Sequence, residues 1–199
     1  MKVRITLVEE MLGTSCQNKE VHAEFIASKS ADAAKSKEEL EALPAEELLE
    51  KAVTVFPRGE DGKPFLWDYQ VKGFIKDAVG LLLEISDKET RVGKTKLSKF
   101  THKRLVDNYV FVSPRKIGLS NPVGAICTRP LRADTMKGER VSLASSETVP
   151  SGTTFECEIK TLAPALEDML RQCLDYGVNL GLGQWRGSGK GRFTWEEVK

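Results

Sequence analysis

A segment rich in glycine and basic residues spans positions 181–192 and is named the glycine segment. It holds five glycines, at 181, 183, 187, 189 and 191, with three cationic side chains and one tryptophan. Glycine lets a backbone approach a phosphate closely and adopt the positive φ angles that turn successive N–H groups toward an anion. The residues expected to contact a phosphate or a base are Gly183, Trp185, Arg186, Gly187, Ser188, Gly189, Lys190, Gly191 and Arg192. Base stacking on the tryptophan would contribute about 1–3 kcal/mol.

Two nucleotide-binding patterns are incompatible with this spacing. A P-loop requires a glycine at 184 and a hydroxyl residue at 191, where the chain has Gln184 and Gly191. The stretch Val92-Gly93-Lys94-Thr95 fails as well, because Lys88 occupies the position of the first glycine. A dinucleotide-binding loop follows a strand and opens a helix, whereas the glycine segment is expected to follow a helix and enter a strand. Two interpretations remain for the glycine segment: a contact with a polyanion such as RNA, or a flexible connection.

Few residues could support catalysis. The chain has two histidines and four scattered cysteines without a CxxC pair, so neither a metal site nor a cofactor is expected. The cysteines are expected to be buried free thiols. His22 is the candidate general base or acid for RNA cleavage, with a lysine or arginine to stabilise the developing charge, and His102 is a poorer candidate.

Charge is unevenly distributed along the chain, although the formal net charge is only +1. Residues 91–140 carry twelve Lys/Arg against three Asp/Glu, while residues 31–61 carry nine acids against four bases. One interpretation is a basic groove beside an acidic arm. The alternative is two ordinary solvated faces, because charge runs commonly have no other role.

Hydrophobic periodicity predicts the elements that must position these residues. Residues 2–9 and 154–160 alternate between apolar and polar side chains, which indicates half-buried strands. The clearest helix spans 68–84, since its apolar residues recur at i, i+3, i+4 and i+7. Gly73 within this helix costs about 1 kcal/mol relative to alanine, which suggests close approach of a backbone or a ligand.

The second half of the chain predicts one more helix and several short strands. An amphipathic helix is expected over 162–178, with Pro164 in its first turn and Gly177 near its end. Short strands are expected at 108–112, 125–131, 141–144 and 192–195, with basic loops between 85 and 150. Residues 54–66 are interpreted as a hairpin inside an insertion that also holds one or two helices.

The order of these elements indicates an α+β fold. Without its insertions the chain runs strand, helix, strands, helix, strand, which is typical of a ferredoxin-like (RRM-related) antiparallel sheet with two helices. Large insertions at 11–66 and 85–150 and the C-terminal glycine-rich loop would complete a single domain over 1–199. No run is long and apolar enough to cross a membrane, and the amino terminus does not resemble a signal peptide, so a cytoplasmic protein without a membrane partner is expected.

Three separated motifs resemble the RAMP (repeat-associated mysterious protein) superfamily, whose members build CRISPR effector backbones and process guide RNAs. The first is Leu66-Trp67-Asp68-Tyr69-Gln70-Val71-Lys72-Gly73-Phe74-Ile75-Lys76, which is similar to the family's start of the first helix. The second is Glu147-Thr148-Val149-Pro150-Ser151-Gly152-Thr153-Thr154-Phe155, which is similar to its E-x-V-P-x-G-T-x-F strand entry. The third is the glycine segment itself. Their order along the chain agrees with the family, and type III backbone subunits are the most similar members.

The resemblance implies that RNA passes the glycine segment and the start of the first helix, which would assign RNA contacts to Lys72 and Gly73. It also implies that the basic excursion is a thumb-like extension laid over RNA. Its RNA-contacting residues would be Arg129, Arg132, Lys137 and Arg140, near a turn at 136–138. Two departures are evident: bulky residues replace the small ones at 67–70, and the loop at 10–15 lacks the aspartate of cleaving subunits.

Three functions remain open from the sequence. The leading hypothesis is a non-catalytic RNA-binding protein that holds a single strand and associates with other CRISPR effector subunits or with itself along RNA. The second is a metal-independent endoribonuclease that processes guide RNA with His22. The third is a phage or mobile-element protein that inhibits host defence by mimicking or binding a CRISPR complex, or by sequestering a nucleotide signal. The acidic arm would favour such a partner.

Overall fold

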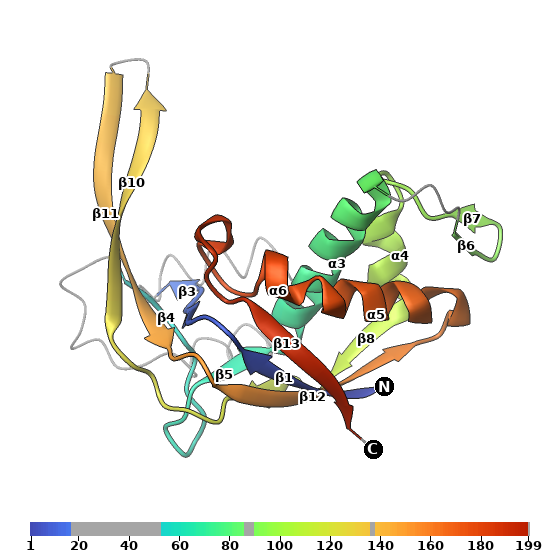
Figure 1. The fold of residues 1–199 in the computed structure, drawn as a ribbon, viewed down its shortest axis with the longest axis horizontal. Coiled ribbons are helices and arrows are strands. Elements are labelled where there is room, and N and C mark those ends of the chain that lie inside the picture. The colour runs from blue at the N-terminus through green and yellow to red at the C-terminus, as the bar shows by residue number, and fades with distance from the viewer. Residues whose placement is uncertain (17–52, 86–89, 136–137, 199) are drawn as a thin grey trace, which may run out of the picture.

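A computed structural model describes residues 1–16, 53–85, 90–135 and 138–198 of the chain. Its centre is a four-stranded sheet of β1 (Lys2–Leu7), β8 (Val110–Ser113), β12 (Thr154–Thr161) and β13 (Phe193–Val198). The strand order is β13-β1-β12-β8, and every neighbouring pair is antiparallel (Figure 1). The predicted α+β class with antiparallel strands is therefore confirmed.

The alternation seen in the sequence decides which face of the central sheet is buried. Val3, Ile5 and Leu7 of β1 are buried, and the residues between them are exposed or half-buried. On β12, alternate residues from Phe155 to Ile159 join the same hydrophobic core. A strand with one apolar face must cover that face, and the helices do so.

Three α-helices of eight residues or more lie in the described residues: α3 (Asp68–Ile85), α4 (His102–Tyr109) and α5 (Glu167–Asp175). Helix α3 packs against both of the others and against β8, and its predicted apolar stripe is buried. Phe74 of α3 meets Phe193 of β13 edge to face, with ring centroids 5.0 Å apart. The long periodic helix was therefore predictable at nearly its true length.

The sequence analysis missed α4. Helix α4 lies among basic residues that were expected to form loops, because it buries only His102, Leu105 and Val106, too few to show a period. Gly177 lies near the end of the second helix, as predicted, since α5 ends at Asp175 and the short α6 (Gly177–Leu180) follows it. A side chain at Gly177 would collide with the Phe193 ring, so this glycine also permits close packing.

A long hairpin projects from the body of the protein (Figure 1). It consists of β10 (Ile126–Thr135) and β11 (Gly138–Val149), which pair from Ile126↔Glu147 to Thr135↔Gly138. The predicted strands at 125–131 and 141–144 are thus parts of longer ones. Of the wider range 85–150, α4 and β8 contribute buried side chains to the hydrophobic cluster.

The base of the hairpin is tied to the amino-terminal part of the chain. Strand β11 pairs in parallel with β4 (Val53–Val55) and antiparallel with β2 (Met11–Leu12). Strand β4 also pairs with β3 (Ser15–Cys16), which gives a second sheet in the order β10-β11-β4-β3. A short β6–β7 ribbon (Arg91–Val92, Thr95–Lys96) lies apart from both sheets.

The hairpin predicted over 54–66 is confirmed at its turn, whereas the two strands that flank the turn do not pair with each other. Strand β5 (Phe65–Trp67) pairs with β9 (Lys116–Gly118), whereas β4 pairs with β3 and β11. Between β4 and β5 there is an isolated bridge, Arg58↔Pro64, closed by a turn at 59–62. All three side chains of β5 are buried, so neither face of this strand is exposed to solvent.

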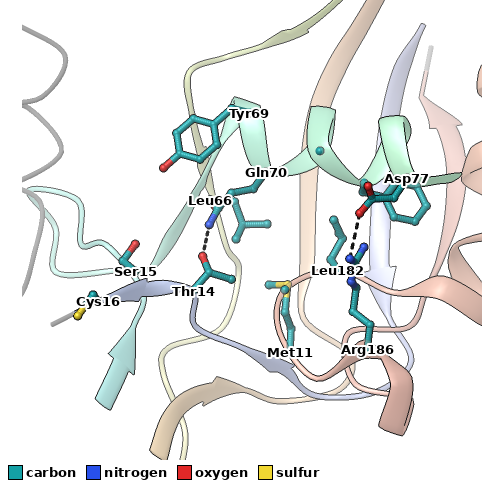
Figure 2. A pocket seen from close by; sticks show the side chains of 13 residues that line it. Met11, Thr14, Ser15, Cys16, Leu66, Tyr69, Gln70, Asp77, Leu182 and Arg186 are labelled. Atoms are coloured by element: carbon teal, nitrogen blue, oxygen red, sulfur yellow. Dashed lines mark hydrogen bonds and ion pairs between the residues drawn. The ribbon is translucent and has the colours of Figure 1, made fainter. Parts of the chain in front are cut away.

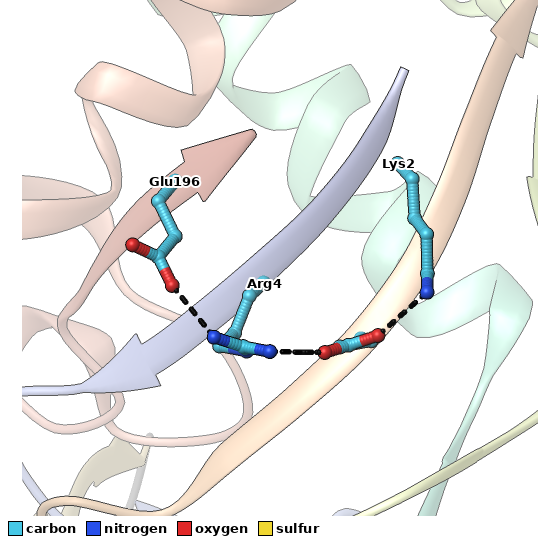
Figure 3. A network of polar contacts seen from close by, with 4 residues as sticks. Lys2, Arg4 and Glu196 are labelled. Carbon is cyan, nitrogen blue, oxygen red and sulfur yellow. Dashed lines mark hydrogen bonds and ion pairs between the residues drawn. The ribbon is translucent and has the colours of Figure 1, made fainter. Parts of the chain in front are cut away.

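Ion pairs cross the outer face of the central sheet (Figure 3). Arg4 on β1 pairs with Glu156 at 2.8 Å and with Glu196 at 3.0 Å, and Glu156 also pairs with Lys2 at 2.9 Å. Hydrogen bonds from Lys2 and Arg4 lower the pKa of Glu156. Exposed pairs of this kind add little stability, but they match opposite charges across three strands.

No helix among the described residues is long and apolar enough to cross a membrane. His22, Lys137 and most of the acidic range 31–61 lie outside the described residues.

Candidate nucleic-acid interface

The glycine segment forms an ordered loop between α6 and β13. The N–H of Leu182 donates to the carbonyl of Gly191 at 2.8 Å, and the N–H of Gly191 donates to the carbonyl of Glu10, also at 2.8 Å. The carbonyl of Arg192 accepts from Val8 at 2.8 Å. These bonds fasten both ends of the loop to each other and to the chain that follows β1.

Four of the five glycines, at 181, 183, 189 and 191, have positive φ angles, which explains their residue type. A side chain at Gly183 would lie 2.7 Å from the carbonyl oxygen of Leu12, and one at Gly191 would overlap the Leu182 carbonyl. Gly187 has no atom near its Cβ position and lies in the single 3₁₀ turn Arg186–Ser188. Gly183 and Gly191 are therefore needed where the backbone of the loop packs closely, whereas Gly187 has open space at its Cβ position.

A recess of about 390 Å³ lies between the glycine segment, the first turns of α3 and the β2–β3 region (Figure 2). These segments are far apart in sequence, yet the structure brings the predicted residues Gly73, Gly183 and Arg186 to the same cavity. A Cβ at Gly73 would meet nothing within 4 Å. The full lining is Met11, Thr14, Ser15, Cys16, Leu66, Tyr69, Gln70, Gly73, Phe74, Asp77, Leu182, Gly183 and Arg186.

The lining of this recess combines apolar and polar groups. Its apolar side chains include Met11, Leu66 and Phe74, and hydrophobic walls of this kind are usual in ligand sites. Gln70 donates to the Thr14 hydroxyl, and its side-chain oxygen accepts from the Trp67 N–H at 2.8 Å (Figure 2). An apolar wall with a few directed polar groups suits a flat heteroaromatic ring such as a nucleobase.

Acidic side chains of the chain itself pair with three of the predicted cations. Arg186 binds Asp77 at 2.9 Å, and Lys190 binds Glu10 at 2.5 Å, which raises the pKa of Lys190. Lys72 donates to the Asp107 carbonyl at 3.0 Å and lies 3.8 Å from the Asp107 carboxylate, and desolvation by burial lowers the pKa of Lys72. The Arg186–Asp77 pair is the most exposed of the three, so it contributes little stability and could exchange its carboxylate for a phosphate. The exposed Arg192 makes no ion pair within the described ranges.

Arg129, near the base of the hairpin, contacts the glycine segment. Its guanidinium donates to the Ser146 hydroxyl at 2.9 Å and to the Gln184 side-chain oxygen at 2.8 Å, and it lies 5.4 Å from the centroid of the Trp185 ring. Arg129 is therefore in contact with Trp185, as well as being buried. Arg132 and Arg140 occupy backbone positions farther along β10 and β11, opposite Val141 and Ala133, and their side chains lie outside the part of the protein that the structure describes.

The second motif, 147–155, holds the fold together. Glu147 is buried and accepts from the Arg58 guanidinium at 2.7 Å and from the Phe56 N–H at 2.9 Å. Gly152 has a φ of +78° and donates to the Leu7 carbonyl, while the Thr153 hydroxyl donates to the Pro150 carbonyl at 2.6 Å. The Glu147 contacts thus join the base of the hairpin to residues 56–58, and the Gly152 bond joins the turn before β12 to the end of β1.

Several lining residues were not singled out from the sequence, among them Tyr69, Gln70, Asp77 and Thr14. A signal was present on α3, since residues 70, 73 and 77 have the i, i+3, i+7 spacing of one helix face. Once Gly73 was suspected, its neighbours on that face could have been proposed with it. Thr14 lies in a loop, where no periodicity marks it.

The described residues include no cluster of three or more metal-ligating side chains. His102 is buried, and its Nδ1 lies 3.2 Å from the Ser98 carbonyl, which is a structural contact. Burial raises the pKa of the Cys157 and Cys173 thiols to about 12. The prediction of buried free thiols is confirmed for these two, whereas Cys16 and Cys127 are only half-buried.

No family model matches the sequence, and no curated protein matches it. Among solved structures, the chain is similar to one in the cryo-EM structure of the Type III-B Cmr-beta bound to cognate target RNA, with a TM-score of 0.52 and 11% identity. The match covers 100% of this chain and 58% of the other, so this chain spans less than two thirds of its length. A chain of a Type IV-B CRISPR complex matches with a TM-score of 0.46, 11% identity and coverage of 98% and 88%. The first likeness is one of fold.

Proposed function

We propose that this protein is a non-catalytic, RAMP-like RNA-binding protein that holds single-stranded RNA across the recess between α3 and the glycine segment. The observation that carries the proposal is the convergence of Gly73, Gly183 and Arg186 on one cavity beside the projecting hairpin. Residues assigned to RNA by separate motifs thus lie together. The similar Type III-B Cmr-beta structure is described as bound to cognate target RNA, which supports the same ligand class.

The topology supports a ferredoxin-like core for this protein. The chain order β1, α3, β8, β12, α5, β13 and the sheet order β13-β1-β12-β8 match a split β-α-β arrangement with both helices on one face. Helix α4 and the hairpin are then additions to that core. The hairpin β10–β11 is the thumb-like element, with Arg132 and Arg140 along it to contact the strand.

The recess is a better RNA site than the outer face of the central sheet. An RRM stacks bases on aromatic side chains of that face. Here the described residues at its middle are the paired charges Lys2, Arg4, Glu156 and Glu196 (Figure 3). By contrast, two partly exposed aromatic residues lie at the proposed site: Tyr69 lines the recess, and Trp185 belongs to the glycine segment.

Binding would combine weak electrostatic contacts with stacking. Each phosphate neutralised on a single strand contributes about 0.7 to the slope of log affinity against log salt concentration. Stacking on an aromatic side chain contributes about 1–3 kcal/mol per base and tolerates any sequence. The protein should therefore bind RNA with little sequence preference and with a strong dependence on salt. Other CRISPR effector subunits, or further copies of this chain along the RNA, are the proposed partners in the cytoplasm.

The test is fluorescence polarisation with labelled oligouridine over a series of salt concentrations. Saturable binding whose log affinity falls linearly with log salt concentration supports the proposal. Absence of binding at low salt contradicts it. The same samples, run on a denaturing gel with the His22→Ala variant beside the wild type, test cleavage. Products from the wild type alone would favour the endoribonuclease and reject a non-catalytic role.

A further inference from the structure

Arg129 carries a charge that the described part of the chain does not neutralise. The side chain is only 5% exposed, and its neighbours are the neutral groups of Ser146, Gln184 and Trp185. Within the described ranges it makes no ion pair, and its buried Nε has no hydrogen-bond acceptor. Buried charges are normally paired, because an unpaired one loses its hydration without compensation.

Trp185 lies against this charge in an unusual backbone conformation. Its φ of 56° and ψ of 34° place it in the left-handed region, where a bulky residue is strained. The residue is 38% exposed, and its ring centroid lies 5.4 Å from the Arg129 guanidinium carbon. Strain of this kind persists only where the surroundings impose it, and it clusters at binding sites. The indole therefore lies between a buried cation and solvent.

The described neighbours of Arg129 include hydrogen-bond acceptors and an aromatic ring but no anion. Arg192 is exposed on the same loop, and the Lys190–Glu10 pair is close enough to the surface to rearrange. A carboxylate in place of Gln184 would complete a structural ion pair, but the chain offers a neutral amide. A guanidinium fork binds a phosphate through parallel hydrogen bonds, and its Nε–H is one of the donors that such binding uses.

We propose that Arg129 binds one phosphodiester group of single-stranded RNA at the junction of β10 and the glycine segment. Trp185 turns off the guanidinium to admit the phosphate and stacks on the adjoining base. This inference rests on the proposed RNA-binding function and assigns one of its contacts. It also explains why the hairpin and the glycine segment meet through an arginine without a carboxylate partner.

The decisive variant is Arg129→Met, which keeps the aliphatic stem and removes the charge. Because it replaces a buried unpaired charge by an apolar group, we expect its melting temperature to equal or exceed that of the wild type. Its affinity for labelled oligouridine should fall about tenfold, and the salt slope should become shallower by about 0.7. The matched control is Arg171→Met, which removes an exposed arginine on α5 that pairs with Glu197 at 2.7 Å. This variant should change neither the affinity for oligouridine nor the salt slope.

Tryptophan emission provides a second measurement on the folded wild type. Oligouridine should change the emission of the wild type, and Trp185→Phe should lose most of that change, because Trp67 and Trp195 lie outside the junction. An emission change equal in both proteins overturns the inference, as does unchanged affinity and salt slope in Arg129→Met. If either occurs while the wild type binds RNA, the proposed function stands. A wild type that binds no RNA overturns both.

Discussion

The Arg186 guanidinium and the Asp77 carboxylate meet 2.9 Å apart across the recess, although 109 positions separate them in the chain (Figure 2). This ion pair joins the glycine segment to α3. It also places a negative charge beside the cavity in which a polyanion is proposed to bind. The acid both orients the arginine and competes with a phosphate for it.

Removing that acid should therefore strengthen RNA binding. In Asp77→Asn the arginine is released and a repulsive charge near the recess is lost, an effect of about 1 kcal/mol and so about fivefold in affinity. Stability should fall by less than about 1 kcal/mol, because the pair is partly exposed. Polarisation titrations measure the affinity. The control is Glu84→Gln, which breaks the Lys99 pair at the far end of the same helix. Weaker binding by Asp77→Asn would contradict the site.

Side chains at Gly73 should separate helix stability from ligand access. The Cβ position there is open, so Gly73→Ala should raise the free energy of unfolding by about 1 kcal/mol, which urea titration measures. Gly73→Leu should also fold, but its side chain would occupy the recess and lower RNA affinity about tenfold, or ~1.4 kcal/mol. Equal RNA affinity in wild type and Gly73→Leu would show that the ligand does not enter the recess.

Two glycines of the loop should respond differently to alanine. At Gly191 the φ of +71° and the nearby Leu182 carbonyl both oppose a side chain, so Gly191→Ala should lose at least about 2 kcal/mol of stability. Gly187→Ala adds a methyl group in open space and should stay within about 0.5 kcal/mol of the wild type. Urea denaturation compares them. Similar losses at both positions would mean that the loop is less ordered than these bonds imply.

The thiols should react in two classes. Cys157 and Cys173 have pKa values raised to about 12 by burial, so a disulfide reagent at neutral pH should modify only Cys16 and Cys127 until the protein unfolds. Mass spectrometry of the labelled peptides assigns the sites. Prompt labelling of Cys173 in the folded protein would contradict its burial.

The same shift has a consequence for stability at high pH. Cys157 and Cys173 ionise at a higher pH in the folded protein than in the unfolded chain. Their contribution to the free energy of unfolding is therefore complete below the ordinary thiol pKa, and it is lost as the pH rises toward about 12. The free energy of unfolding should therefore fall as the pH rises from about 9 toward about 12. Cys173→Ala should show a shallower fall than the wild type. An equal fall in both proteins would assign the loss to other groups.

The sequence predicted elements whose periodicity is long and uninterrupted. The alternation in β1 and β12 and the stripe on α3 each repeat often enough to show which face is buried. Helix α4 was missed because only Leu105, Val106 and His102 are buried in it. Of the hairpin expected at 54–66 only the turn was predicted correctly, because β5 pairs with β9, a partner far along the chain that local propensity does not encode.

The sequence predicted which residue types form the candidate site, but it predicted their contacts only in part. Glycines and cations were found, but the positions of Glu10, Asp77 and Asp107 beside them follow from tertiary packing. Arg129 was selected as one of several hairpin arginines, and the sequence held no sign that it would be buried against Trp185. In the motif at 147–155, Glu147 and Thr153 hydrogen-bond to other groups of the fold, which the sequence pattern alone did not indicate.

The position of β1 in the middle of the central sheet also affects how the chain acquires its structure during synthesis. Arg4 lies opposite Glu156 and Glu196, 152 and 192 positions away, so both edges of β1 stay unpaired until β12 and β13 have left the ribosome. The hairpin β10–β11 can form earlier, because its pairing is local. A nascent chain stalled before residue 154 would therefore present a finished hairpin on an unfinished core with two open strand edges, a state prone to aggregation and suited to chaperone binding.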